Sequence, residues 1–543
     1  MPVLIILALN CVCQAEPSAT ELEAVQHIEI ARLKSHVEFL AGDLLEGREA
    51  GSRGYDIAAL YVASQFAQLG LAPAGVNGTF LQPVPLRRAT VVPQESSLTL
   101  LRENEKEPLQ YETHYLMSDD YLRTEASITA EAVFAGFGVT APELNYDSYA
   151  GLDVKNKIVV LLSGAPASFP ASRRAHYSSS YVKEKNAVAH GAAGILSVRT
   201  PVDEKRQSWD RIVRQSKLSG FRWLDQQGQP NKVFPEIKGT ALLHRSAAEK
   251  LFSGAEQNLN EVFDSIDKNA IRGFALPLSV SIKKTTRHES TEDPNVVAIL
   301  IGADPKLRNE YIVYSAHLDH IGITDPVDGD QINNGAYDNA TGIAALIEIA
   351  RAFTLLPLKP KRSILFVAVA AEEKGLQGSD YYANFPTVTA DAIVANVNMD
   401  MLLMLYPLKD VIILGEVHSS LGPIARQVAE DLGYQVSPDP APEEVRFIRS
   451  DQYSFTRKGV PAVKFLTGFQ CTDPSINGQE VTKKWLQTIY HSPQDQSDQK
   501  MDWESGKKII AMHFLTGYRI AQLPKRPRWN PGDFFGALYG AGK

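Results

Sequence analysis

Short apolar runs alternate with amphipathic segments through the second half of the chain. Apolar residues recur at helical spacing from Ile343 to Phe353, which predicts a helix that Thr341 caps and that ends before Pro357. Strands that are apolar along their whole length are buried on both faces of a sheet. We therefore predict an α/β fold, with a mixed, mostly parallel sheet and helices on both faces. The expected strands are residues 296–301, 311–316, 364–369, 393–397, 411–414 and 462–466.

The first half contains a smaller β/α pattern. A helix is expected over Ile57–Leu69, ended by Gly70, and alternating patches up to Tyr121 suggest strands. The pattern then predicts a smaller β/α domain inserted into the larger one. Its expected elements are a strand at 158–162, a helix at 183–191 and a strand at 195–198, and the polar stretch 283–294 is interpreted as the return linker.

These patterns divide the chain into five segments. An apolar run over Val3–Leu9, followed by the small residue Ala15, is typical of a secretory signal and predicts export. A lipid anchor at Cys11 or Cys13 is the alternative. The expected segments are a signal peptide (1–15), the N-terminal part of the large domain (16–128), the insert (129–280), the main part of the large domain (281–523) and an extended C-terminal tail (524–543).

Composition narrows the class of protein. The chain has 543 residues, of which 44% are hydrophobic and 22% charged, which suits two to three globular domains. A formal net charge of -8 argues against nucleic acid as a partner, because binding phosphates requires a basic face. No apolar run approaches the roughly 20 residues that span a membrane. Outside the signal segment only Cys471 remains, so no intrachain disulfide is expected.

Acidic residues and histidines follow the predicted strands where the strands end. The strand ending at Ala316 leads into His317-Leu318-Asp319-His320, and the strand ending at Val369 leads to Glu372-Glu373. Asp338 directly precedes a helix, Asp400 follows a strand, and His491 lies in a polar loop. In open α/β sheets, ligands bind beyond the carboxyl ends of the strands, so we expect these side chains to converge.

A divalent metal ion explains this convergence. Two carboxylates at the mouth of a buried strand repel each other and lose hydration unless a cation neutralises them. Imidazole mixed with carboxylate, without thiolate, favours zinc or a neighbouring first-row ion. Carboxylates outnumber histidines, which fits two cations that share a bridging carboxylate. Asp319, two residues after His317, is expected to accept the other ring N–H of that histidine.

Five segments carry a resemblance to a known family. The chain resembles the two-zinc aminopeptidase family, which includes bacterial leucyl aminopeptidases, glutamate carboxypeptidase and the non-catalytic transferrin receptor. The insert is similar to the protease-associated domain of such enzymes, through Gly136-Phe137-Gly138, Lys157–Val160 and Gly191–Gly194. The five segments, in the family's order, are SAHLDHI (315–321), NNGAYDNATGIA (333–344), AEEKGLQGS (371–379), NMDML (398–402) and YHSP (490–493).

The resemblance implies a role for each site residue. It implies two zinc ions per chain, with Asp338 as the bridging ligand. His317 and Asp400 would complete one zinc site, and Glu373 and His491 the other. Glu372 would be the general base and Asp319 would orient His317. The resemblance also implies a cis peptide bond at Asp338-Asn339, and substrate-pocket positions at Arg449–Gln452 and Thr467-Gly468, where Gln452 replaces a common histidine.

The expected activity is the removal of N-terminal residues from peptides. A carboxypeptidase or another amide hydrolase on the same metal site is the main alternative, and a receptor-like relative without catalysis is a second. An aminopeptidase requires an acid near the substrate's ammonium group, for which Asp451 and Glu416 are candidates. A carboxypeptidase requires a base near the substrate's carboxylate, for which Arg48, Arg446 and Arg449 are candidates. The insert is expected to shield the cleft, and the oligomeric state stays open.

Overall fold

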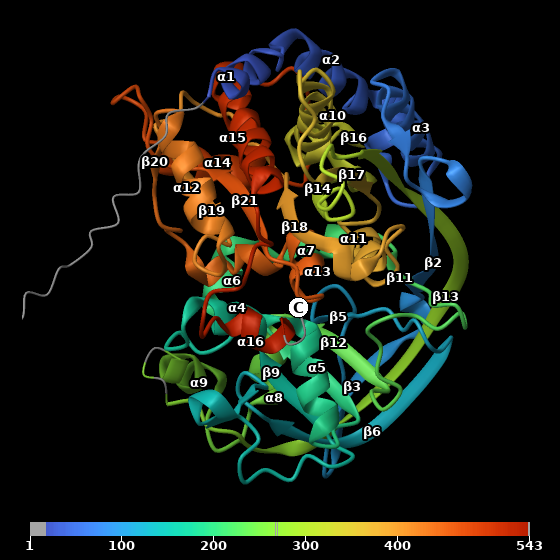
Figure 1. Cartoon of the computed structure of the whole chain (residues 1–543). Helices are drawn as coiled ribbons and strands as arrows, with labels where there is room; N and C mark the ends of the chain where they lie inside the picture. The colour runs from blue at the N-terminus through green and yellow to red at the C-terminus, as the bar shows by residue number, and fades with distance from the viewer. Residues whose placement is uncertain (1–17, 267, 269, 541–543) are drawn as a thin grey trace, which may run out of the picture.

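The computed structural model describes residues 18–540 except 267 and 269. The expected signal peptide therefore lies outside the described residues. Figure 1 shows two lobes, a large lobe that contains the second half of the chain and a small lobe below it. A long curved strand, β13, runs along one side of both lobes.

The large lobe is built on the predicted mixed, mostly parallel sheet. β17, β14, β18 and β21 pair in parallel in that order, and β13 and β19 add antiparallel pairs at their two sides. The strands are β14 (Tyr311–His317), β17 (Ser363–Val369), β18 (Ile393–Asn398), β19 (Asp410–Leu414), β20 (Gln435–Val436) and β21 (Ala462–Thr467), with β1 (Ala72–Pro73) and β2 (Leu81–Val91) beside β13. All six strands expected in the second half are present, because each apolar run is buried on both faces.

Helices cover both faces of this sheet, as the pattern predicts. On one face the helices share the main hydrophobic core with the strands; they are α1 (Ala19–Gln26), α2 (Ile30–Leu40), α3 (Arg53–Gln68), α10 (Thr341–Thr354), α12 (Leu421–Asp431), α14 (Gly478–Thr488) and α15 (Trp503–Gln522). The opposite face packs against α11 (Gln377–Asn384) and α13 (Gln452–Thr456) through Tyr382 and Phe455.

The small lobe surrounds a second hydrophobic core. Its central strands β6, β9, β10 and β12 pair in parallel. Leu98, Leu100 and Met117 also belong to this core, so strands that precede residue 129 contribute to the small lobe. Its strands are β3 (Ser97–Arg102), β4 (Glu105–Pro108), β5 (Tyr115–Met117), β6 (Glu125–Phe134), β7 (Thr140–Ala141), β8 (Tyr146–Asp147), β9 (Ile158–Leu162), β10 (Gly194–Val198) and β12 (Gly239–Leu243). Its helices are α4 (Ala171–Ser178), α5 (Ser180–Ala189), α6 (Pro201–Arg206), α7 (Trp209–Ser216), α8 (Arg245–Leu251) and α9 (Leu259–Ile266).

The polar stretch 283–294 is not a linker. It belongs to β13 (Phe274–Leu300), which pairs with β3 and β6 in the small lobe and with β2 and β17 in the large lobe. Buried and exposed residues alternate along much of β13, so its polar side chains occupy an exposed face while its backbone bonds to neighbouring strands. β11 (Gly220–Trp223) adds a further strand beside β2. A separate hairpin, β15 (Gly322–Val327) and β16 (Asp330–Asn333), lies near the metal ligands in sequence.

Two local expectations are also wrong. Thr341 is the first residue of α10 rather than its cap, and its hydroxyl donates to the carbonyl of Tyr337 at 2.9 Å. The tail is not extended throughout, because α16 (Phe534–Tyr539) forms and buries Phe535 against Phe447 and His418. None of the described helices is long and apolar enough to cross a membrane.

Candidate metal centre

The predicted ligands converge at the carboxyl ends of the parallel strands. His317 is the last residue of β14, and Glu373 and Asp400 follow β17 and β18. Asp338 lies in the turn before α10, and His491 follows α14. These five side chains come from separate parts of the chain, and the parallel sheet brings them together because its strands all end at one edge.

One cluster of ligand atoms is formed by His317, Asp338 and Asp400. The Nε2 atom of His317 lies 3.2 Å from Asp338 Oδ1 and 3.6 Å from Asp400 Oδ1. All three residues are buried. Burial alone would raise the pKa of the Asp338 carboxyl, but its contacts with His317 and His491 outweigh burial and hold that pKa well below its usual range.

The second cluster shares Asp338 and contains one residue that the sequence analysis did not select. His491 Nε2 lies 3.0 Å from Asp338 Oδ2 and 3.2 Å from Glu373 Oε2, the two residues with which it was predicted to bind a metal. His320 Nδ1 lies 2.8 Å from Glu373 Oε1 and 3.9 Å from Asp338 Oδ2. His320, Asp338 and Glu373 therefore form a possible ligand group of their own. The sequence feature that could have identified His320 is its position three residues after His317, in the segment that follows a predicted strand.

The donor atoms of the second cluster suit a cation. Both ring nitrogens of His320, Nε2 of His491 and Oε1 of Glu373 are buried, and their close approaches to one another and to Asp338 do not have the geometry of hydrogen bonds. Buried polar atoms without partners cost free energy, and a divalent ion would satisfy several of them at once. Imidazole nitrogen and carboxylate oxygen together are ligands that zinc prefers.

Asp495 supports the bridging position. Its two carboxylate oxygens accept the backbone N–H groups of Tyr337 and Asp338 at 3.0 and 3.1 Å. The Asp338-Asn339 peptide bond is cis, as the resemblance implies. The Asn339 side chain accepts the backbone N–H of Gly342 and donates to the carbonyl of Met399. The turn that carries Asp338 is therefore held on both sides, and no sequence pattern pointed to Asp495.

Asp319 is close to His317, but its carboxylate has a different partner from the expected one. The Nδ1 atom of His317 lies 3.1 Å from the backbone carbonyl of Asp319 and 4.0 Å from its carboxylate. The carboxylate instead accepts the backbone N–H groups of Glu372 and Glu373, at 2.9 and 3.2 Å. Asp319 thus orients His317 through its main chain and fixes the Glu372-Glu373 turn through its side chain.

Asp400 is held from the side opposite His317. Its Oδ2 atom accepts the hydroxyl of Ser450 at 2.5 Å and lies 2.8 Å from Nζ of Lys464. Burial alone would raise the pKa of Asp400, but the positive charge of Lys464 and the contact with His317 outweigh it, so the pKa falls below its usual range. Asp400 is therefore oriented as an ionised ligand.

Glu372 lines the same cavity as the ligands. Desolvation raises the pKa of its carboxyl well above the usual range, and the neighbouring charges of Asp451 and Glu373 add to this effect. His317 opposes the shift. A carboxyl group with a raised pKa beside a metal centre is suited to exchange a proton during hydrolysis.

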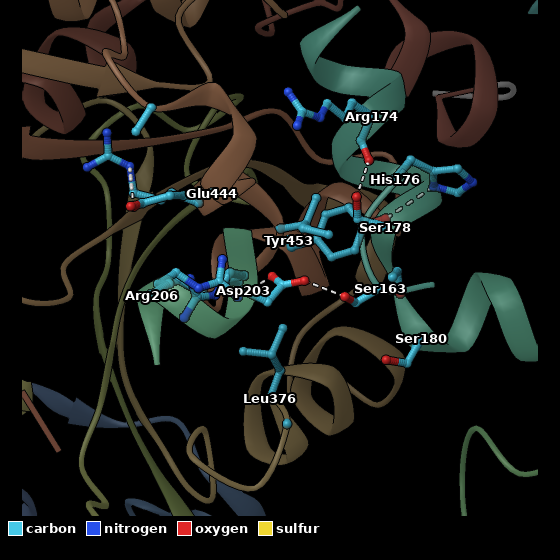
Figure 2. Close-up of a pocket in the computed structure, with 18 of the residues that line it drawn as sticks. Ser163, Arg174, His176, Ser178, Ser180, Asp203, Arg206, Leu376, Glu444 and Tyr453 are labelled. Atoms are coloured by element: carbon cyan, nitrogen blue, oxygen red, sulfur yellow. Dashed lines mark hydrogen bonds and ion pairs between the residues drawn. The ribbon is translucent and has the colours of Figure 1, made fainter. Parts of the chain in front are cut away.

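The cavity is a chamber of about 1860 Å³ between the two lobes. It is lined by metal-centre residues and by residues of α4, α5 and α6 of the small lobe. Figure 2 shows Arg174, His176 and Ser178 on one side of this space and Glu444 and Tyr453 of the large lobe nearby. The predicted ligands therefore face a chamber that both lobes enclose.

The predicted pocket residues separate into two groups. Arg449, Ser450 and Thr467 line the chamber. Gln452 is fully buried, accepts the side-chain amide of Asn398 at 2.8 Å and donates to the carbonyl of Phe447. Gln452, in place of the common histidine, therefore affects the hydrogen bonds that hold Asn398 below the metal centre and does not change the chamber wall.

The part of the chain that contains the predicted ligands is similar to known peptidases. Residues 295–515 match the model of peptidase family M28. Over 106 residues the chain is 36% identical to a protein named probable zinc metalloprotease from Pyrenophora teres f. teres, covering 20% of this chain and 22% of the relative. Over 218 residues it is 28% identical to a probable leucine aminopeptidase 2 from Aspergillus oryzae, covering 38% of this chain and 39% of the relative. These alignments thus span about a fifth to two fifths of the relatives' length.

The whole chain also has a structural neighbour. The aminopeptidase from Aneurinibacillus sp. strain AM-1 superposes with a TM-score of 0.54 at 19% identity, covering 92% of this chain and 95% of that one. At this identity the likeness concerns the fold. The segment that carries all five predicted ligands lies within residues 295–515, the part of the chain that matches the family model.

Proposed function

We propose that the chain is a zinc-dependent aminopeptidase that removes N-terminal residues from short peptides. The observation that carries the proposal is the pair of buried ligand clusters that share Asp338, with Glu372 on the wall of the same chamber. The names of the M28 relatives, a zinc metalloprotease and a leucine aminopeptidase, support the same reaction class.

The proposed cofactor is two zinc ions per chain. His317, Asp338 and Asp400 would hold one ion, and Asp338, Glu373 and His491 the other, with His320 beside the second. When bound, such a pair supplies Lewis acidity, which makes water a nucleophile near neutral pH and stabilises a developing oxyanion. Ser450 and Lys464 keep Asp400 ionised and oriented, and Asp495 holds the turn that carries Asp338.

Glu372 is the proposed general base and acid. Its carboxylate takes a proton from the attacking water and delivers it to the nitrogen of the leaving amine. Burial raises its pKa above that of an ordinary glutamate, which makes the carboxylate a stronger base toward the proton of the water. The bond from Asp319 to the backbone of Glu372 keeps the carboxylate in reach of the scissile bond.

A carboxypeptidase is the second candidate function, and it depends on a basic side chain that can bind the substrate's C-terminal carboxylate. Arg48 donates to the backbone carbonyls of Leu318 and Asn334, at 2.9 and 2.7 Å, and is fully buried. Arg446 and Arg449 both line the chamber, but Arg446 pairs with Asp439, whereas Arg449 has no ion pair among the described residues. Arg449 could receive a substrate carboxylate, and this observation favours a carboxypeptidase as the alternative.

The two acidic residues considered for binding the substrate's ammonium group, Asp451 and Glu416, do not line the chamber. Asp451 is fully buried, and Glu416 pairs with Arg426 at 2.5 Å. In an aminopeptidase the substrate's ammonium group would instead meet the carboxylates of the metal centre itself. Glu372 and Asp400 both line the chamber and supply that negative charge.

We also propose that the chain is exported and that the small lobe acts as a protease-associated shield. The apolar run Val3–Leu9 supports export. The position of α4, α5 and α6 on the chamber wall supports the shield, because these helices limit the length of chain that can enter.

A combined metal and activity assay tests the proposal. The full chain is expected to contain two zinc ions by mass spectrometry of the metal, and to release p-nitroaniline from leucine p-nitroanilide. N-acetylated peptides are expected to resist cleavage. Cleavage of blocked peptides alone would establish the carboxypeptidase instead, and a zinc-loaded chain that cleaves neither would indicate a non-catalytic relative.

A further inference from the structure

The chamber wall is basic wherever it is not part of the metal centre. Twelve of the described side chains that line it are lysine or arginine. Apart from the four carboxylates of the metal centre, only three of its described lining residues are acidic. Over the whole chain the balance is reversed, with 63 acidic and 55 basic residues. The positive charge is therefore a local property of this chamber.

The three other acids already have partners. Asp203 accepts the hydroxyl of Thr200 at 2.6 Å and pairs with Arg206 at 3.2 Å. Asp380 pairs with Lys232 and Arg457, at 3.2 and 2.6 Å.

Glu444 lies 3.9 Å from Nε of Arg446. These contacts use three acids and four bases of the wall, so none of the three acids compensates the remaining bases.

Seven basic side chains of the wall have no ion pair among the described residues. One of them, Arg211, donates to the backbone carbonyls of Leu486 and Tyr490, which leaves six. Each lobe contributes three of them, so positive charge lies on both sides of the chamber. Five of the six are exposed and Arg174 is half-buried, so their charges are open to a ligand. They are Arg174 on α4, Lys185 on α5 and Lys205 on α6 in the small lobe, and Arg449, Lys458 and Lys483 in the large lobe.

A cleft lined by charges of one sign concentrates ligands of the opposite sign. Low-dielectric walls focus the field, and such steering raises association rates by about 10- to 1000-fold at low salt. Arginine and lysine both bind carboxylates, and arginine does so through two parallel hydrogen bonds. Figure 2 shows Arg174 and Arg206 of the small lobe on the same chamber as Glu444 and Tyr453 of the large lobe.

We propose that this basic wall makes the enzyme selective for short peptides that carry carboxylates beyond the scissile bond. The inference rests on the proposed function and adds the substrate class. Carboxylates can come from acidic side chains or from the peptide's own C-terminus, and both would meet the six unpaired bases. Peptides with lysine or arginine in the same positions would be repelled.

Matched peptides test the selectivity. The full zinc-loaded chain is assayed with Leu-Glu-Glu-amide, Leu-Lys-Lys-amide, Leu-Gly-Gly-amide and Leu-Gly-Gly with a free carboxylate. We expect kcat/KM to be about tenfold or more higher for the Glu peptide than for the Lys peptide at low salt. Comparing kcat/KM for Leu-Gly-Gly with that for Leu-Gly-Gly-amide measures the effect of the C-terminal carboxylate alone. At 0.5 M NaCl the differences should shrink, because the Debye length falls to about 4 Å.

A triple variant of the small lobe locates the effect. Arg174→Gln, Lys185→Gln and Lys205→Gln together are expected to lower the Glu-to-Lys ratio by about threefold or more. The matched control is Lys106→Gln, Lys155→Gln and Lys238→Gln, three exposed lysines of the same lobe that do not line the chamber. This control should keep the wild-type ratio.

The outcomes separate the inference from the proposed function. Equal kcat/KM for the Glu and Lys peptides, or a ratio that the triple variant leaves unchanged, would overturn the basic-wall selectivity while leaving the peptidase intact. If no peptide and no leucine p-nitroanilide is cleaved, the proposed function fails. In that case, binding of fluorescent acetyl-Glu-Glu-Glu tests the inference. The Kd should rise at least threefold in the triple variant, and an unchanged Kd would contradict the basic-wall proposal.

Discussion

The carboxylate of Asp319 accepts the backbone N–H of Glu372 at 2.9 Å. It accepts the next N–H, that of Glu373, at 3.2 Å. A residue after β14 thus positions both the proposed general base and a metal ligand, which follow β17. The main-chain carbonyl of the same aspartate lies 3.1 Å from the ring of His317. Asp319 therefore connects three members of the site without lining the chamber itself.

Asp319→Asn should impair turnover more than metal binding. The amide side chain keeps one acceptor oxygen and places an NH₂ group against the second backbone N–H. Because small displacements of reacting groups are costly, we expect kcat to fall about 10- to 100-fold. Zinc content at saturating zinc should stay close to the wild-type value. Loss of zinc in proportion to activity would instead assign Asp319 to ligand support alone.

Glu372→Gln should abolish most proton transfer and leave the ligands in place. We expect kcat on leucine p-nitroanilide to fall by about 10²-fold or more, because general acid–base catalysis typically contributes that much. Metal analysis is the companion measurement, and Glu373→Gln is the contrast that should lose zinc. Near-normal turnover of the Glu372 variant with full metal would remove the residue from this role.

Removal of metal should destabilise the protein. Asp338, Glu373 and Asp400 are buried or nearly so and lie close together, and without a cation their mutual repulsion is offset by the neighbouring histidines and Lys464 alone. Binding at a free zinc concentration about 100 times Kd contributes roughly 2.7 kcal/mol to the free energy of unfolding. Thermal unfolding should therefore occur at lower temperature in chelator and recover with zinc. In the Asp338→Asn variant, the difference in unfolding temperature between zinc and chelator should be smaller than in the wild type. An equal difference in the two proteins would argue against a metal at this site.

His176 should make stability fall in acid. Desolvation lowers the pKa of this imidazole to about 4; Glu143 opposes the shift and Lys185 adds to it. Between the ordinary value of 6.5 and about 4, the unfolded chain binds the proton and the folded chain does not. The stability is complete above pH 6.5 and declines toward pH 4, by at most about 3 kcal/mol.

Urea unfolding at pH 7 and at pH 4.5 measures this effect. His176→Gln should show a smaller difference between the two pH values than the wild type. His27→Gln, at the end of α1, is the matched control and should keep the wild-type difference. Identical pH dependence in the His176 variant would contradict the assignment.

The C-terminal helix α16 should stabilise the contact between the lobes. Phe535 is fully buried beside Phe447 and Tyr453 of the large lobe, and Phe534 packs against His176 of the small lobe. Phe535→Ala should cost about 3–5 kcal/mol of unfolding free energy. Leu538→Ala on the same helix, where the side chain is 46% exposed, should cost about 0.5 kcal/mol or less. Equal effects of the two changes would show that α16 is not packed as described.

The sequence predicted local elements well and long-range pairing poorly. Apolar runs such as Ile364–Val369 identified the strands of the large sheet, because burial on both faces leaves a continuous hydrophobic signal. The stretch 283–294 was mistaken for a linker, because a strand with one exposed face carries polar residues and its pairing partners lie far away in the chain. The helix α16 was missed, because it is only six residues long and lies in a tail rich in glycine and proline, and the burial of Phe535 that accompanies it depends on distant residues.

The sequence alone indicated which chemical groups would meet, because strand ends placed His317, Glu373 and Asp400 at one edge of a parallel sheet and motif order added Asp338 and His491. Only the tertiary structure decided their supports. It brought in His320 and Asp495, turned the Asp319 carboxylate toward the Glu372 backbone and lined both sides of the chamber with basic side chains. Residue type and spacing encode which groups a strand presents, whereas the direction of a side chain and its distant partners depend on how the whole chain packs.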